Sequence, residues 1–239
     1  MVPNDRIQSH EIQPDRLRVI RDSAFQGALL INGREVMVPF ATNLSRMGIL
    51  TTVTRRHDVC QAIIHHDACF SAARCFDTLK FAGISTHFCV DNDSTVWQFA
   101  DPALRVAWHA KGHIRNVKGQ IVEASFNWHS VGVDISNRVV LADAGKVKPP
   151  RDVATIPVQG KPYTGLLPYP RQIETTLDLL RVIREHFPMI TTSTHLDLRW
   201  VGTVQPATPG IWGHCHVSRA KIDPFGFPFG RVNDLDVAG

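Results

Sequence analysis

The 239-residue chain lacks several features that would place it in a specialised class of protein. No apolar run approaches the roughly 18 residues that a membrane-spanning helix needs, so we expect no membrane span. The N-terminal residues are polar and have no apolar core, which differs from a standard secretory signal and predicts a protein that is cytoplasmic as synthesised. With 44% apolar and 20% charged residues, the composition is that of a folded globular protein.

The cysteine content and the charge argue against two further classes. Five cysteines at irregular spacing do not suit a disulfide framework and favour reduced, buried thiols. The net charge of +4 is compatible with an anionic partner but does not indicate one. Because no Lys/Arg cluster is interleaved with aromatic residues, we expect no nucleic-acid partner.

The first half of the chain shows strand and helix signals. Residues 1–57 form an N-terminal extension, in which residues 27–40 (GALLINGREVMVPF) predict a β-hairpin around the turn pair Asn32-Gly33. We expect residues 58–239 to form the rest of a single domain. A short buried strand then ends in two histidines, and the next segment predicts a helix that Ser71 caps and Gly83 ends.

The second half mixes further strands with one long helix. Residues 86–100 predict a hairpin, and a loop carrying Trp108 and His109 follows it. The alternating run 130–136 predicts a strand whose Asp134 points away from its apolar face. The run 143–170, with six prolines, predicts a long irregular surface loop.

An apolar stripe at helical spacing predicts a helix from Pro170 to just before Pro188. Strands interspersed with helices and hairpins indicate an α/β fold. We therefore expect a mixed central β-sheet that is flanked by helices.

Histidines cluster at two places that suit a metal site. The run IIHHD (63–67) places His65 and His66 at the end of a strand, and GHCHVSRAKIDP (213–224) offers His214, His216 and Asp223. A hydrolytic zinc site uses three protein ligands and keeps a fourth position open for water. Two histidines and one aspartate satisfy that requirement, although paired histidines are common without a metal.

The order of these segments resembles a known family. Between about residues 58 and 230 the chain is similar to the zinc-dependent N-acetylmuramoyl-L-alanine amidases, which include phage endolysins, anhydromuropeptide-recycling amidases and animal peptidoglycan recognition proteins. The blocks occur in the family's order and read IIHHD, ISTHFCVDNDSTVWQF, AWHAKG, SVGVDIS and GHCHVSRAKIDP. The resemblance implies the amidase-like fold of these proteins, with residues 58–239 as the catalytic core.

The resemblance also implies a ligand set and a reaction. One zinc ion per chain would be held by His65, His214 and Asp223. Asp134 would move protons as general base and acid, and Lys221 would stabilise the oxyanion of the tetrahedral intermediate. The substrate would be the amide between N-acetylmuramic acid and L-alanine, in peptidoglycan or in small muropeptides.

The chain departs from its relatives at three positions. Asp134 stands where recycling members usually have Glu, and Thr86 stands where some phage members place a catalytic Tyr. His216 replaces an Asp that many members carry, so it is either an alternative ligand or a partner of the ligands.

Four residues match cleft positions of the family or flank the ligands, and we expect them to contact substrate: His87, His109, Trp108 and His216. The alternative for His87 and His109 is a histidine whose hydrogen bonds are satisfied within a hairpin or loop.

Two other classes of function remain open at this point. Some relatives bind muropeptides without cleaving them, so a non-catalytic peptidoglycan-binding module of the same fold is one alternative. The other is a structural or interaction protein with incidental histidines. Within the enzyme interpretation, a phage-type lytic enzyme would be released to the periplasm or cell wall, whereas a recycling enzyme would act in the cytoplasm.

Overall fold

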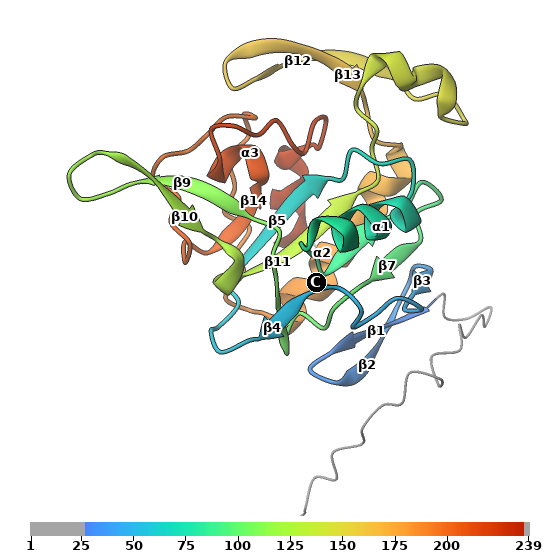
Figure 1. The fold of residues 1–239 in the computed structure, drawn as a ribbon, viewed down its shortest axis with the longest axis horizontal. Helices are drawn as coiled ribbons and strands as arrows, with labels where there is room; N and C mark the ends of the chain where they lie inside the picture. Colours follow the sequence, from blue (N-terminus) through green and yellow to red (C-terminus); the bar gives the residue numbers. More distant parts are fainter. Residues whose placement is uncertain (1–26, 237–239) are drawn as a thin grey trace, which may run out of the picture.

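A six-stranded sheet forms the centre of the computed structural model, which describes residues 27–236 (Figure 1). Counting across the sheet from one edge, the first three pairs of neighbouring strands are parallel. The fourth pair is an antiparallel hairpin, and the fifth pair is parallel. The mixed sheet expected from the sequence is thus confirmed. In spatial order the strands are β14 (Gly210–Gly213), β5 (Gln61–His66), β11 (Ser130–Ile135), β6 (Phe88–Val90), β7 (Val96–Gln98) and β3 (Thr42–Asn43).

One helix covers each face of this sheet. The apolar stripe of α2 (Pro170–His186) packs Leu177 into the main core with Val133 of β11. The helix α1 (Ala72–Ala82) lies on the opposite face, where Phe76 joins a smaller apolar cluster. Side chains alternate between the faces along β11, so its apolar residues face α2 and Asp134 faces away from them, as its sequence predicts.

The helix ends follow the predicted capping signals. The Ser71 hydroxyl accepts a hydrogen bond from the backbone N–H of Arg74 at 3.3 Å, which caps α1. Gly83 ends α1 in the left-handed region at φ 68°, a conformation that glycine adopts without a Cβ penalty. Pro170 is the first residue of α2, and the helix ends before Pro188.

The predicted N-terminal hairpin is present. It consists of β1 (Gly27–Ile31) and β2 (Arg34–Val38), joined by Asn32 and Gly33 at φ 55° and 68°. Two successive positive φ angles are those of a type I′ turn, which matches the right-handed twist of the flanking strands.

Side chains of the core hold this hairpin in place. Gln98 on β7 accepts from the Leu30 N–H at 2.8 Å and donates to the Leu30 carbonyl at 2.6 Å, as a neighbouring strand would. The Asp101 carboxylate accepts from the turn residues Asn32 and Gly33 at 3.0 and 2.8 Å. The hairpin is therefore an integral part of the folded body.

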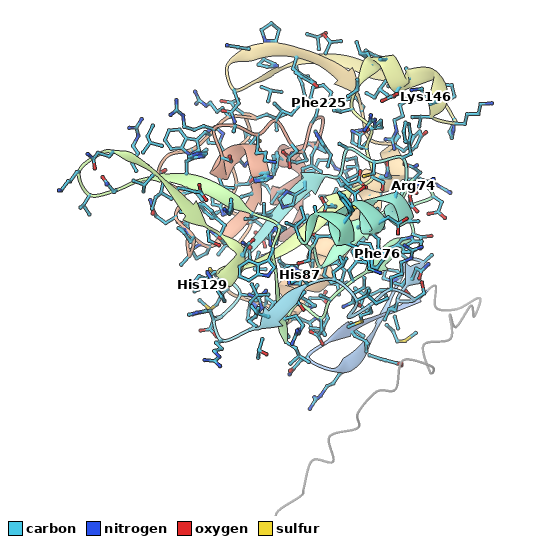
Figure 2. All side chains as sticks on the ribbon, in the orientation of Figure 1. Arg74, Phe76, His87, His129, Lys146 and Phe225 are labelled. Carbon is cyan, nitrogen blue, oxygen red and sulfur yellow. The ribbon has the colours of Figure 1, made fainter. Side chains whose placement is uncertain are left out.

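The prediction of an irregular loop over residues 143–170 is wrong. A short 3₁₀ helix (Leu141–Lys146) precedes an antiparallel hairpin of β12 (Val153–Val158) and β13 (Lys161–Leu166), which projects at the top of Figure 1. Phe225 lies beneath this hairpin (Figure 2), and its ring is 5.3 Å from that of Tyr163.

The prolines and glycines of this segment suit the hairpin. Gln159 and Gly160 form its turn with φ 51° and 76°. Pro157 and Pro162 are paired across the two strands, next to the pair that closes the turn. At this position of an antiparallel ladder, the two paired residues do not hydrogen-bond to each other. Proline has no N–H to lose there, so a proline-rich sequence still forms strands.

Short elements complete the described chain. The region predicted as a loop around Trp108 and His109 also contains strands, because the hairpin of β9 (Lys111–Arg115) and β10 (Ile121–Ser125) follows directly. Within residues 27–236, no helix is long and apolar enough to cross a bilayer, and all five cysteines are free. The remaining elements are β4 (Thr52–Thr54) paired with β8 (Arg105–Ala107), β9 (Lys111–Arg115) paired with β10 (Ile121–Ser125), α3 (His214–Val217), and 3₁₀ helices at Asn127–His129 and Phe229–Asp236.

Candidate metal centre and active site

The candidate site lies where three parallel strands end. His65 is the penultimate residue of β5, Asp134 is the penultimate residue of β11, and His214 follows β14 directly. These strands are neighbours and run in parallel, so their carboxyl ends meet at one edge of the sheet. The strand order thereby brings together side chains that are about 150 positions apart in the chain.

His65, His214 and Asp223, which lies in the loop after the short helix that His214 begins, each present one atom to a common point, and we refer to them as the triad. The Nδ1 atom of His65 is 3.0 Å from Nδ1 of His214, and the two nitrogens are 3.2 and 3.1 Å from Oδ2 of Asp223. A tetrahedral zinc ion separates such ligand atoms by about 3.4 Å, given bonds of roughly 2.1 Å. All three residues are buried, and the set fits a zinc site with one open position.

The remaining ring nitrogen of each histidine is held by another residue. Nε2 of His214 lies 3.2 Å from the Lys111 carbonyl, which only accepts, so this nitrogen carries the proton. Nε2 of His65 lies 3.0 Å from Nδ1 of His109. Such outer hydrogen bonds set the tautomer of a metal-binding histidine and orient its ring.

The donor and the acceptor in the hydrogen bond between His65 and His109 follow from the other hydrogen bonds of His109 and Ser130. Ser130 Oγ is 2.8 Å from the Phe126 carbonyl, to which it must donate, and 3.0 Å from Nε2 of His109, from which it accepts. His109 therefore carries its proton on Nε2, and its bare Nδ1 accepts from Nε2–H of His65. This leaves Nδ1 of His65 without a proton and available to a metal.

Gly132 leaves the space that the His109 ring of this hydrogen-bonded series occupies. A Cβ at Gly132 on β11 would lie 2.7 Å from Cγ of His109 and 2.8 Å from the Thr86 hydroxyl oxygen. Neither neighbour is the end of a long flexible side chain, so only glycine leaves the His109 ring in position.

Burial and the neighbouring groups set the charges of His65, His109 and Asp223. Burial lowers the pKa of His65 to about 4, and lowers that of His109 well below its usual range, so both rings are neutral near pH 7. Burial by itself would raise the pKa of Asp223, but His214 and His65 outweigh it and hold this pKa well below 3.8. Neutral imidazole with an ionised carboxylate is the protonation state that metal binding requires.

A pocket of about 380 Å³ opens over the triad and contains the two other predicted catalytic residues. Asp134 is buried, and both this burial and the negative charge of nearby Asp67 raise its pKa to about 8. Lys221 is exposed and lines the same pocket. The site thus combines a candidate metal centre, a carboxyl group with a pKa near neutrality and one cation.

The predicted substrate contacts differ in their access to the pocket. His109 lines it, and the adjacent Trp108 is half-buried with its ring 5.5 Å from that of Trp128. His87 lies inside the fold (Figure 2), fully buried, and accepts from the Gly132 N–H at 2.9 Å. The structure therefore does not bring His87 to the pocket.

His216 is likewise occupied elsewhere. Its Nδ1 accepts from the Gly213 N–H at 3.0 Å, and its Nε2 lies 3.1 Å from the Asp197 carbonyl. Both ring nitrogens are thus bound to backbone groups, away from the pocket. His214 and Cys215 form the start of the helical turn α3, which directs Cys215 into the main core.

Sequence reasoning missed several residues that position the site, among them Ser130, Gly132 and the carbonyl groups of Lys111 and Phe126. Part of the signal was available, because the alternation in SVGVDIS places Ser130 and Gly132 on the same face as Asp134. The two carbonyl groups carry no sequence signal, since every residue has one.

Comparison with known proteins identifies one family. The family described as N-acetylmuramoyl-L-alanine amidase matches residues 55–226 of the chain. A search of curated proteins finds no significant match.

Solved structures of the same fold include AmpDh3 from Pseudomonas aeruginosa, with a TM-score of 0.50 and 16% identity over 78% of this chain and 63% of that chain. The N-acetylmuramyl-L-alanine amidase AmiD from E. coli, in complex with the substrate anhydro-N-acetylmuramic acid-L-Ala-D-gamma-Glu-L-Lys, has a TM-score of 0.47 and 17% identity over 77% and 59%. Drosophila PGRP-LB has a TM-score of 0.44 and 14% identity over 81% and 94%. The chain thus spans less than two thirds of the AmpDh3 and AmiD chains.

Proposed function

Because the chain belongs to the N-acetylmuramoyl-L-alanine amidase family, we propose that it hydrolyses the amide between N-acetylmuramic acid and L-alanine in peptidoglycan or muropeptides, and that it does so with zinc. One observation carries this proposal. His65, His214 and Asp223 converge to within 3.2 Å at a pocket that also holds Asp134 and Lys221. A module that only binds ligand would not need this combination of groups.

The triad would hold the metal through Nδ1 of each histidine and Oδ2 of Asp223. When bound, zinc supplies Lewis-acid chemistry, which lowers the pKa of water to about 7 and polarises a carbonyl group. The contribution of the chain is to keep both Nδ1 atoms free of protons. Lys111 does this for His214 through its carbonyl, and His109 does it for His65.

Asp134 is the group on this chain best suited to move a proton. Its carboxyl group lines the pocket, and with a pKa of about 8 it can both accept and release a proton near neutral pH. It would take a proton from the attacking water and deliver it to the amine that leaves as the amide C–N bond breaks. His109, which also lines the pocket, keeps both ring nitrogens in hydrogen bonds.

Lys221 would supply positive charge to the oxygen atom of the carbonyl group under attack. It lies two residues before Asp223 and lines the pocket, so its ammonium group can approach an oxygen atom that becomes negative during attack on the carbonyl. Preorganised charge of this kind stabilises a tetrahedral intermediate more than the ground state. The pocket volume lies in the range that holds a small ligand or part of a larger one.

The test measures the release of new L-alanine amino termini from purified peptidoglycan and from a small muramyl peptide, with and without a chelator. We expect wild type to cleave at least one substrate, and we expect both the chelator and His214→Ala to abolish cleavage. His186→Ala, an exposed histidine at the end of α2, is the matched control and should remain active. Zinc binding without cleavage of either substrate would reject the amidase and favour a muropeptide-binding protein.

A further inference from the structure

A second group of metal-binding side chains lies at the same pocket as the triad but shares no residue with it. The group consists of Asp67, Cys75 and Cys89, and one ligand atom from each lies within 4.8 Å of the others. Asp67 follows β5, Cys75 lies on α1, and Cys89 lies on β6, so three separate elements contribute to the group. We refer to it as the thiol cluster.

The register of the sheet separates the thiol cluster from the triad. On neighbouring strands, Asp134 of β11 pairs with His65 of β5 on one side and with Cys89 of β6 on the other. Paired residues project from the same face, so these three side chains form a row across the sheet. Two strand spacings of roughly 4.8 Å place the backbones of His65 and Cys89 about 10 Å apart, with Asp134 between them.

Hydrogen bonds fix the carboxylate of the cluster and direct one oxygen atom at a thiol. Oδ1 of Asp67 accepts from the backbone N–H groups of Cys69 and Asn137 at 2.8 and 3.2 Å. Oδ2 accepts from the Ser136 hydroxyl at 2.7 Å and lies 3.7 Å from Sγ of Cys89. Sulfur and oxygen ligands of one zinc-sized ion are separated by about 3.5 Å, so this spacing already suits a shared cation.

The acidic groups at and beside the cluster have no ion-pair partner among the described residues. Within residues 27–236, neither Asp67 nor Asp134 forms an ion pair. A divalent cation would supply the missing charge.

We propose that Asp67, Cys75 and Cys89 form a second cation site, selective for soft divalent ions such as Zn²⁺ and Cd²⁺. Two thiolates distinguish it from the triad, because sulfur ligands favour such soft ions over Mg²⁺ or Ca²⁺. On binding, each Sγ–H bond breaks, a sulfur–metal bond forms, and the two protons go to solvent without any electron transfer. An ion can enter from the pocket, which Asp67 and Cys75 line.

Cd²⁺ added to metal-free protein tests this proposal, because cadmium bound to thiolate gives a charge-transfer absorption band in the ultraviolet. The triad contains only nitrogen and oxygen ligands, so the band reports the thiol cluster alone. We expect wild type to bind two equivalents of Cd²⁺, one of which produces the band. His65→Ala should lose one equivalent and keep the band.

Cys75→Ala and Cys89→Ala should each abolish the band and still bind one equivalent at the triad, which also shows that these variants are folded. Cys60→Ala is the matched control, since Cys60 is a buried cysteine that does not line the pocket, and its band should equal that of wild type. Zn²⁺ added afterwards should remove the band by competition.

Three outcomes would overturn the proposal: a single equivalent bound by wild type with no band, a band that persists in both Cys75→Ala and Cys89→Ala, or a band lost in Cys69→Ala but retained in those two variants. Activity is not part of the readout, so a failure of the proposed amidase function would leave this result unaffected.

Discussion

The hydrogen bond between His109 and His65 leads to a quantitative prediction about zinc affinity. In the metal-bound protein, His65 must carry its proton on Nε2, which faces Nδ1 of His109 at 3.0 Å. Replacing His109 by leucine removes this acceptor and leaves a buried N–H group without a partner. In the metal-free protein, His65 can shift its proton to Nδ1 and donate to Asp223, 3.2 Å away. The penalty therefore falls on the metal-bound state.

An unsatisfied buried donor costs about 1–3 kcal/mol. Since about 1.4 kcal/mol is a factor of ten in a binding constant, His109→Leu should weaken zinc binding by roughly 5- to 150-fold. His109→Asn should recover most of the loss, because its Oδ1 is attached to Cγ as Nδ1 is in histidine. Competition with a chromogenic chelator measures the affinities directly.

His129→Leu is the control for this experiment, because its ring contacts the Asp58 carbonyl rather than the site. Zinc affinity in His109→Leu within twofold of wild type would refute the reasoning. So would an asparagine variant as weak as the leucine variant, since the acceptor would then not be the cause.

Three further predictions concern catalysis and stability. Asp134→Asn should lower hydrolysis by about 10²- to 10⁴-fold while the zinc content stays at the wild-type level, as metal analysis alongside the kinetics will show. Gly132→Ala should lower the free energy of unfolding by about 1–3 kcal/mol, because the added Cβ overlaps His109. Unfolding in urea measures this against the control Gly145→Ala, whose Cβ meets no neighbour. Equal stability of the two variants would contradict the prediction. Burial and the charge of Arg55 lower the pKa of His87 from 6.5 to about 3, so the unfolded chain binds the proton first and stability should fall as the pH drops from about 6.5 toward 3. His87→Asn should flatten that slope in unfolding curves measured across the range, and an unchanged slope would exclude His87 as its source.

Local signals were sufficient for the elements whose ends depend on neighbouring residues. Ser71 caps the start of α1 and Gly83 ends it, and Asn32-Gly33 forms the turn between β1 and β2. These features could be predicted because caps and tight turns depend on residues a few positions apart. The proline-rich hairpin of β12 and β13 escaped prediction. Its strands depend on cross-strand pairing and on a turn at Gln159-Gly160 that composition alone obscured.

The sequence by itself determined which residue types are available at the site, since the strand-end histidines and the Asp-Pro segment can be identified without a structure. Only the tertiary structure decided what those residues do. The parallel order β14–β5–β11–β6 places His65 between His214 and Asp134, and Asp134 between His65 and Cys89. The tautomer of His65 and the assembly of the thiol cluster depend on contacts between residues that are remote in sequence, and strand order and register establish those contacts.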